Sequence, residues 1–222
     1  KDFIEIYYTD HSISHSIRIL ENIHSVLSSN NKQTLLNEFE KYILISAALL
    51  HDIGMQHEVK EENSDIRRRQ HHILSEQIII ANWSEIGIIQ NYANTIAKIS
   101  KAHRGDYEEL EVIHFGAGIE VREDLLANLL FLGDELDITY ERVCPERKKL
   151  LNYRPEAQFH FYKHYYTQAY HIDIEHQIFI TLRFPSNKQS EYSQIFRNSM
   201  IDSISKLLSN ISPILIAKYQ IT

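Results

Sequence analysis

Six side chains of metal-ligating type recur between positions 15 and 134, each inside or beside an apolar run. His51 and Asp52 are adjacent and end the apolar stretch YILISAALLHDIGM, residues 42–55. The other four are His15, His71, His103 and Asp134. Imidazole nitrogens and carboxylate oxygens together bind Mn, Fe, Zn, Ni or Mg, according to the number of ligands and their geometry. The pattern therefore predicts a centre for one or two divalent metal ions.

A single histidine at the end of an apolar helix also has a simpler explanation. Such a residue is more often a hydrogen-bonded structural side chain, and His51 with Asp52 could form a capping pair. The joint pattern favours the metal, because several segments each deliver a ligand-type side chain toward a common core. Burying ionised carboxylates without a metal or a partner would cost several kcal/mol each.

Hydrophobic periodicity places these residues on helices. Helices are predicted at about 10–30, 34–52, 66–82, 86–103 and 120–138. Residues 104–118 are polar and contain glycine, which predicts a loop, and Gly54 is well placed to end the second helix. The stretch AYHIDIEHQIFITLRF alternates polar and apolar residues, which predicts a β-hairpin with its turn near Glu175 and His176. Residues 190–219 are predicted to return to helix.

The expected fold class is mainly α, a helical bundle with a small β-hairpin and a C-terminal helix appended. The chain has 222 residues with only 6 glycines and 4 prolines, which favours long helices over many turns. We expect residues 1–145 to form a helical metal-binding core. Residues 146–222 would form an α+β extension packed on it, within a single domain.

Charge and composition narrow the functional classes. The 23 basic and 30 acidic residues give a net charge of −7, which weakens the case for a broad nucleic-acid surface. No segment approaches the roughly 20 apolar residues of a membrane span, and the N-terminus lacks a signal-peptide pattern. The single cysteine, Cys144, cannot form an internal disulfide. We expect a cytoplasmic protein. The missing initiator methionine suggests a piece of a longer one with additional domains.

The order of these residues resembles the HD superfamily of metal-dependent phosphohydrolases over residues 8–140. LLHDIG, residues 49–54, is similar to the superfamily's LLHDIGK, and GDELD, residues 133–137, to its A-D-x-L-D segment. HSISHSIRIL is similar to its H-x-x-x-H-x-x-R-V opening. His71 and His103 match two further histidines of the superfamily, although the neighbouring His72 remains an alternative to His71. We predict that the other histidines are not ligands (His11, His24, His57, His114 and those near the C-terminus), although His11 lies one turn before His15 and could face the site.

The resemblance implies a helical fold with the metal site at its centre. His15, His51, Asp52 and Asp134 would hold one ion, while His71 and His103 would hold a second that Asp52 bridges. The implied activity is that of a phosphohydrolase or phosphodiesterase, in which metal-bound hydroxide attacks a nucleotide or phosphodiester. Asp52 and Arg104 are the predicted catalytic residues, Arg104 as the phosphate-binding group. The expected partner is a phosphorylated small molecule or nucleotide, with nucleic acid less favoured and no membrane.

Weaker candidates for contacting the substrate are Arg142, Lys163 and His164. Asp137 is either a residue that orients a ligand histidine or a helix-surface residue.

Departures from the HD superfamily's motifs argue against several of its known groups. The glycine-tyrosine-proline signature of one class of cyclic-dinucleotide phosphodiesterase is absent after the paired histidines. Met55 and Gln56 replace the acidic pair of alarmone hydrolases, and Met55 replaces a histidine of deoxynucleotide triphosphohydrolases. What remains is similar to HD domains that bacteria fuse to ATPase-type modules. Two alternatives stay open: a non-catalytic, metal-stabilised sensor or scaffold of a larger protein, and a nuclease on single-stranded nucleic acid.

Overall fold

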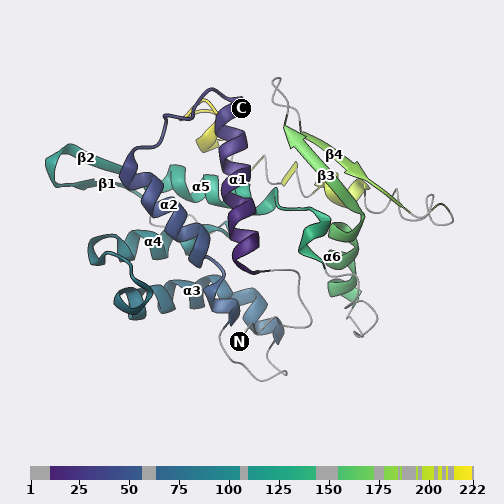
Figure 1. The fold of residues 1–222 in the computed structure, drawn as a ribbon, viewed down its shortest axis with the longest axis horizontal. Coiled ribbons are helices and arrows are strands. Elements are labelled where there is room, and N and C mark those ends of the chain that lie inside the picture. Colours follow the sequence, from purple (N-terminus) through teal and green to yellow (C-terminus); the bar gives the residue numbers. More distant parts are fainter. Residues whose placement is uncertain are drawn as a thin grey trace.

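The protein is mainly α-helical in a computed structural model, as its sequence predicts, and Figure 1 shows its elements. The structure describes residues 11–56, 64–105, 110–143, 155–172 and 178–184, together with parts of 186–221. His57, Cys144, the predicted boundary at 145/146 and the predicted turn at Glu175 and His176 lie outside the described residues. The elements in chain order are α1 (Ile13–Ser29), α2 (Glu38–Leu50), η1 (Ile53–Gln56), α3 (Ser64–Ile86), α4 (Gln90–Ala102), β1 (Val112–Phe115), η3 (Gly116–Gly118), β2 (Ile119–Arg122), α5 (Glu123–Glu135), η4 (Tyr140–Arg142), α6 (Pro155–Tyr166), β3 (Thr167–Ile172) and β4 (Ile178–Leu182).

The first two helices begin at residues that cap them. The Ser12 side chain accepts a hydrogen bond from the Ser14 backbone N–H at the start of α1. At the start of α2, Asn37 and Glu40 form a capping box, in which each side chain accepts from the other residue's backbone N–H. These caps satisfy backbone donors that have no intrahelical partner, and they fix where each helix starts.

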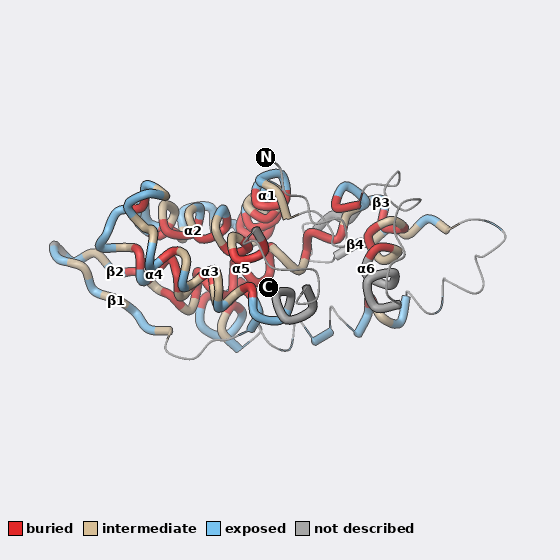
Figure 2. Tube along the Cα trace, turned by 90° about the horizontal axis from the view of Figure 1, so that it is seen from below, coloured by how far each residue is buried: buried red, intermediate tan, exposed pale blue. Residues whose placement is uncertain are grey.

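The core lies between α1, α2, α4 and α5. Helix α5 packs against α1, α2 and α4 and is buried along most of its length, with Leu125, Leu126, Leu129 and Leu130 fully covered. Figure 2 shows the buried residues concentrated where these helices meet. Helix α3 packs against α4 and against η1, so the short segment after α2 lies close to α3. Helical residues 197–202 and 213–215 agree with the predicted C-terminal helix.

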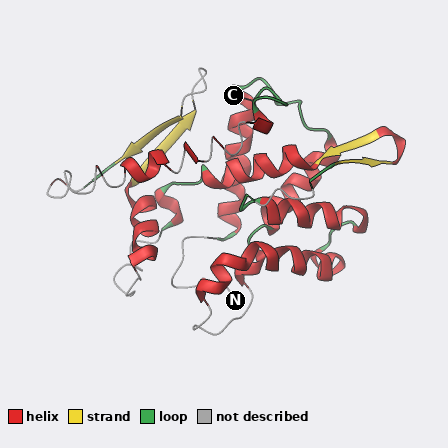
Figure 3. Cartoon of the chain, turned by 180° about the vertical axis from the view of Figure 1, so that it is seen from behind, coloured by secondary structure: helices red, strands yellow, loops and turns green. Residues whose placement is uncertain are grey.

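Two antiparallel hairpins complete the described fold (Figure 3). The predicted hairpin is confirmed: β3 pairs with β4, with Ile172 opposite Ile178. The prediction of a loop at 104–118 is wrong in part, because Val112–Phe115 forms β1 and pairs with β2. Four-residue strands are too short for alternation to stand out against neighbouring polar residues. The views of Figures 1 and 3 place this hairpin on the other side of α1 from α6, β3 and β4.

Two glycines allow close approaches beside the predicted ligands. A Cβ at Gly54 would lie 2.3 Å from the His71 carbonyl oxygen, so glycine is required where η1 meets α3 rather than to end α2. A Cβ at Gly133 would lie 2.8 Å from the Ile23 side chain and 2.9 Å from the Ile19 carbonyl oxygen, where α5 meets α1. Gly54 follows Asp52 by two residues and Gly133 precedes Asp134, so both positions help to place a carboxylate. Among the described helices, none is both long enough and apolar enough to cross a membrane.

Candidate metal centre

Helix ends deliver most of the predicted ligands to one place, which we call the His–Asp cluster (His15, His51, Asp52, His71, His103 and Asp134). His51 and His103 are the C-cap residues of α2 and α4, and Asp134 lies in the last turn of α5. His15 lies in the first turn of α1 and His71 within α3. The six side chains come from five helices and their ends, so the fold, rather than one local motif, assembles the cluster.

The Asp52 carboxylate is the centre of the cluster. Its Oδ2 lies 3.0 Å from His51 Nε2 and 3.7 Å from His15 Nε2. Its Oδ1 lies 3.1 Å from His71 Nε2 and 3.6 Å from His103 Nε2. The two oxygens therefore face different imidazoles. A carboxylate whose two oxygens face different imidazoles has the arrangement expected of a group that bridges two cations.

Asp134 completes one side of the cluster. Its Oδ1 lies 3.2 Å from His15 Nε2, and the ring centroids of His15 and His51 are 5.3 Å apart. One potential ligand group therefore contains His15, His51 and Asp134, and a second contains Asp52, His71 and His103. Within each group the candidate ligand atoms lie within 4.8 Å of one another.

The second ring nitrogen of three histidines is already engaged. His51 Nδ1 donates to the Ala48 carbonyl oxygen at 2.8 Å, and His103 Nδ1 donates to that of Ser100 at 2.5 Å. His15 Nδ1 donates to Asp137 Oδ2 at 2.6 Å. A neutral imidazole that donates from Nδ1 presents a lone pair at Nε2.

Those lone pairs point at carboxylate oxygens. The Nε2 atoms of His15 and His51 are buried, and within the described chain neither makes a hydrogen bond. Lone pairs facing carboxylates repel each other unless a proton or a cation lies between them. The donor set, neutral imidazole with carboxylate, suits a divalent transition metal or magnesium. The residues present therefore fit the metal centre that the sequence predicts.

Burial and the neighbouring charges shift the pKa values of the cluster in opposite directions. Burial by itself would lower the pKa of His51, but the charges of Asp52 and Asp134 outweigh it and raise that pKa to about 9. Burial, with His51 nearby, lowers the pKa of His103 to about 3. Burial opposes ionisation of Asp52, yet His51 and His11 hold its pKa well below the usual range. A bound cation would displace the His51 proton, so metal binding should release protons.

Of the two adjacent histidines on α3, the structure places His71 against Asp52. His71 is buried, and its Nε2 lies 2.9 Å from His103 Nε2. The His72 ring lies edge-on to His71 and His103, with centroid separations of 5.8 and 6.4 Å. His71 Nε2 also lies 3.1 Å from Asp52 Oδ1. Sequence alone left this choice open because it depends on how α3 is rotated about its axis.

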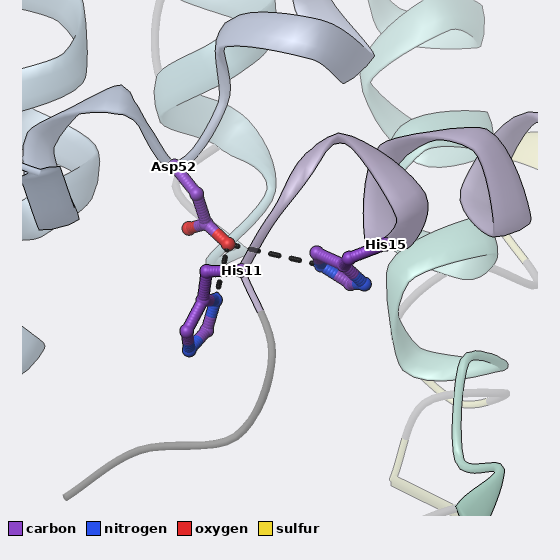
Figure 4. A group of neighbouring side chains, drawn as sticks. All are labelled: His11, His15 and Asp52. Carbon is purple, nitrogen blue, oxygen red and sulfur yellow. Dashed lines mark hydrogen bonds and ion pairs between the residues drawn. The ribbon is translucent and has the colours of Figure 1, made fainter. Parts of the chain in front are cut away.

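His11, which is predicted not to be a ligand but to lie where it could face the site, is found beside the His–Asp cluster. Its Nδ1 is 2.6 Å from Asp52 Oδ2, and Figure 4 shows His11 and His15 approaching the same carboxylate oxygen from different directions. His24 and His114 lie away from the cluster, hydrogen-bonded to Ser28 and paired with Glu120. In the sequence, the four-residue spacing between His11 and His15 is the pattern that indicates that His11 could face the site.

Asp137 orients His15 and is not a surface residue. It is buried, and Arg18 Nε donates to both of its oxygens at 2.9 and 3.1 Å. Arg142 is also buried, donates to the Asp137 carbonyl oxygen at 3.3 Å, and places its Nε 3.7 Å from Oδ2. Arg142 therefore supports the cluster from inside the protein. Sequence reasoning missed Arg18, which follows His15 by three residues on α1.

Two other cationic candidates lie near the cluster. Arg104 follows His103 at the surface, and its charge acts on Glu135 beside Asp134. Lys163 of α6 is partly buried; burial lowers the pKa of its ammonium, while Glu135 and Asp134 oppose that shift. His164 is buried. Arg104 and Lys163 thus contribute positive charge from two elements to the region around Asp134.

Comparison with known proteins gives one family. The protein-family model HD-CE matches residues 5–210. No curated protein matches, and no solved structure matches. The matched region contains every residue of the His–Asp cluster together with α6, β3 and β4.

Proposed function

The chain belongs to the HD-CE family, and from this membership and the geometry of the His–Asp cluster we propose that it is a metal-dependent phosphohydrolase acting on a nucleotide or phosphodiester. One observation carries the proposal. The two oxygens of Asp52 each face imidazole nitrogens, and three of those rings already use their other nitrogen as a donor. Such a set of converging donors supports divalent cations on both sides of a bridging carboxylate.

The residues divide between two ion positions. His15, His51, Asp52 and Asp134 would hold one ion, and His71, His103 and Asp52 would hold the other. Divalent ions bound there, from among Mn, Fe, Mg, Ni and Zn, would lower the pKa of a coordinated water and polarise a phosphoryl oxygen. Asp137 keeps the His15 ring in the orientation that turns Nε2 toward Asp52 and Asp134.

Arg104 and Lys163 are the residues we propose for binding the substrate. A phosphate group near Asp134 and Glu135 would meet carboxylate repulsion unless cations offset it. The Arg104 guanidinium is exposed and can form paired hydrogen bonds with phosphate oxygens. Lys163 approaches from α6 and can act as a compact positive charge. In this proposal Asp52 and Arg104 are the catalytic residues.

The test combines metal analysis with turnover. Wild-type protein, Asp52→Asn and the control Asp124→Asn are analysed for bound metal and for phosphate release from nucleotides and phosphodiesters with added Mn²⁺. Asp124 pairs with Lys218 and Tyr219 away from the cluster, so its variant should behave as wild type. Asp52→Asn should bind less metal and lose turnover. A wild-type protein with no metal and no activity with added Mn²⁺ would sink the proposal.

Two other outcomes identify the alternatives. Bound metal without turnover over the whole substrate panel would favour a non-catalytic sensor or scaffold that uses the metal for stability. Cleavage of a labelled single-stranded oligonucleotide, but not of nucleotides, would favour a nuclease. The net charge of −7 makes that second outcome the less expected one.

A further inference from the structure

His11 is an imidazole that lies beside the His–Asp cluster and has no role in the two proposed ion positions. It lies just before α1, and its side chain is 24% exposed whereas that of His15 is 1% exposed. Its Nδ1 approaches Asp52 Oδ2 to 2.6 Å, and its ring lies edge-on to His15 at 5.8 Å between centroids. In Figure 4, His11 reaches Asp52 from the segment before α1, on a different side from His15.

The two oxygens of Asp52 do not have equal numbers of imidazole neighbours. Oδ1 faces His71 at 3.1 Å and His103 at 3.6 Å. Oδ2 faces three rings, those of His11 at 2.6 Å, His51 at 3.0 Å and His15 at 3.7 Å. The candidate ligand atoms of His11, His15 and Asp52 all lie within 4.8 Å of one another. The Oδ2 side is thus richer in nitrogen donors than the Oδ1 side.

We propose that His11 is an additional ligand on the Oδ2 side of Asp52. That ion position would then have three imidazoles, from His11, His15 and His51, and two carboxylates. The inference rests on the proposed metal centre, and it also predicts which metals that centre prefers. Imidazole-rich sites favour Fe, Ni and Zn over Mg, which prefers oxygen ligands.

A different role would give the same short contact. The His11 Nδ1–H could donate a hydrogen bond to Asp52 and orient that carboxylate without touching an ion. Glutamine separates the two roles, because its amide can still donate to a carboxylate but is a poor ligand for a transition metal. Alanine removes both functions.

The experiment measures metal affinity rather than activity. Tag-free, chelator-treated wild type, His11→Gln, His11→Ala and the control His24→Gln are titrated calorimetrically with Ni²⁺ and with Mg²⁺, after thermal melts establish that each is folded. His24 is exposed on α1 and hydrogen-bonds Ser28, so its variant should bind as wild type. Both His11 variants should weaken Ni²⁺ binding by at least about 10-fold, because losing a ligand should cost no less than losing a hydrogen-bond partner behind one, with a smaller effect on Mg²⁺. The absorption bands of the Co²⁺-loaded protein should also change.

The outcomes separate this inference from the proposed function. If His11→Gln binds Ni²⁺ as tightly as wild type while His11→Ala does not, His11 acts through its hydrogen bond and the ligand proposal is overturned. If neither variant differs from wild type, it is overturned as well, and the metal centre still stands. A wild-type protein that binds neither ion overturns the metal centre and this inference together.

Discussion

Three histidines of the cluster are held in two different ways, according to where each lies on its helix. His51 and His103 lie at C-terminal ends, and each donates from Nδ1 to the carbonyl three residues earlier in its own helix. His15 lies in the first turn of α1 and donates to Asp137, a residue 122 positions away in sequence. Two of these histidines are thus oriented by their own helix, and one is oriented by a tertiary contact.

The reason lies in the backbone of the helix. The last four carbonyls of a helix lack intrahelical partners, and side chains lean toward the N-terminus, so a histidine at the C-cap reaches one of them. At the start of α1, the Ser12 carbonyl already accepts from the Ser16 N–H. His15 therefore needs another acceptor, and the one it has is a carboxylate that Arg18 also holds. Where the helix itself supplies an acceptor for Nδ1, the local sequence determines the orientation of the imidazole ring. Where it does not, as at His15, the packing of α1 against α5 determines that orientation.

The largest expected effect comes from removing the distant acceptor. Asp137→Ala leaves Arg18 and the buried Arg142 without the carboxylate that they face, and His15 without its partner. Breaking a buried charge pair by removing one member costs about 3–5 kcal/mol. Urea denaturation of the metal-free protein measures this loss. The matched control is Glu141→Ala, which removes an exposed carboxylate 4.0 Å from Arg18 and should change stability by about 0.5 kcal/mol or less. Equal losses in the two variants would show that Asp137 has no special role.

The part of the cluster around His51 and His103 needs a different test. The acceptors of these histidines are backbone carbonyls, which a substitution cannot remove. Gly54→Ala places a methyl group 2.3 Å from the His71 carbonyl oxygen, so η1 and α3 must separate. Overpacking of this kind costs about 1–3 kcal/mol. Thermal denaturation compares it with Gly116→Ala, where the added Cβ meets nothing within 4 Å and stability should stay within about 0.5 kcal/mol. If Gly54→Ala is equally harmless, the close approach does not constrain Asp52.

The same division explains what sequence could predict. Helical periodicity with the adjacent His51 and Asp52 predicted the mainly α fold and the segments that bring the cluster together, because both signals are local. The position of His71 rather than His72 depends on the rotation of α3, which its sequence does not encode by itself. Asp137 could equally have been a surface residue, since only the packing of α1 against α5 brings it to His15 and Arg18. His11 precedes α1, so helical spacing alone could not place it.

A smaller effect is expected when only the charge of the distant acceptor is removed. Asp137→Asn keeps an oxygen that can accept from His15 Nδ1 but removes the negative charge that makes the imidazole a better ligand. Metal affinity should fall about 10- to 100-fold, as calorimetric titration would measure, while the far-UV spectrum stays the same. Asp124→Asn, at a surface pair with Lys218, is the control for loss of a carboxylate charge. Unchanged affinity in Asp137→Asn would mean that the negative charge of Asp137 is not needed, and that a neutral oxygen accepting from His15 Nδ1 is enough.

The smallest expected effect tests whether ion pairing, rather than burial, keeps the Asp137 carboxylate ionised. Both Asp137 and Glu123 are buried carboxylates. Burial would raise the pKa of Asp137, but His15 and Arg18 outweigh it and hold that pKa below its usual value. Burial raises the pKa of Glu123, and the Lys98 Nζ lies 3.8 Å from its Oε2.

The two shifts have opposite consequences for stability. A lowered pKa stabilises the fold above the unfolded value of about 3.9 for aspartate, and that contribution is lost as pH falls through the folded pKa. The raised pKa of Glu123 gives a contribution that is complete below about 4.3 and is lost as pH rises through the folded value. Glu123→Gln should therefore gain stability relative to wild type between pH 4.5 and 7.5, by about 1 kcal/mol or less. Urea denaturation at the two pH values measures this gain. If the difference in stability between Glu123→Gln and wild type does not change with pH, Lys98 offsets the burial of Glu123 as effectively as Arg18 offsets that of Asp137. One nearby cation is then enough to keep a buried carboxylate ionised.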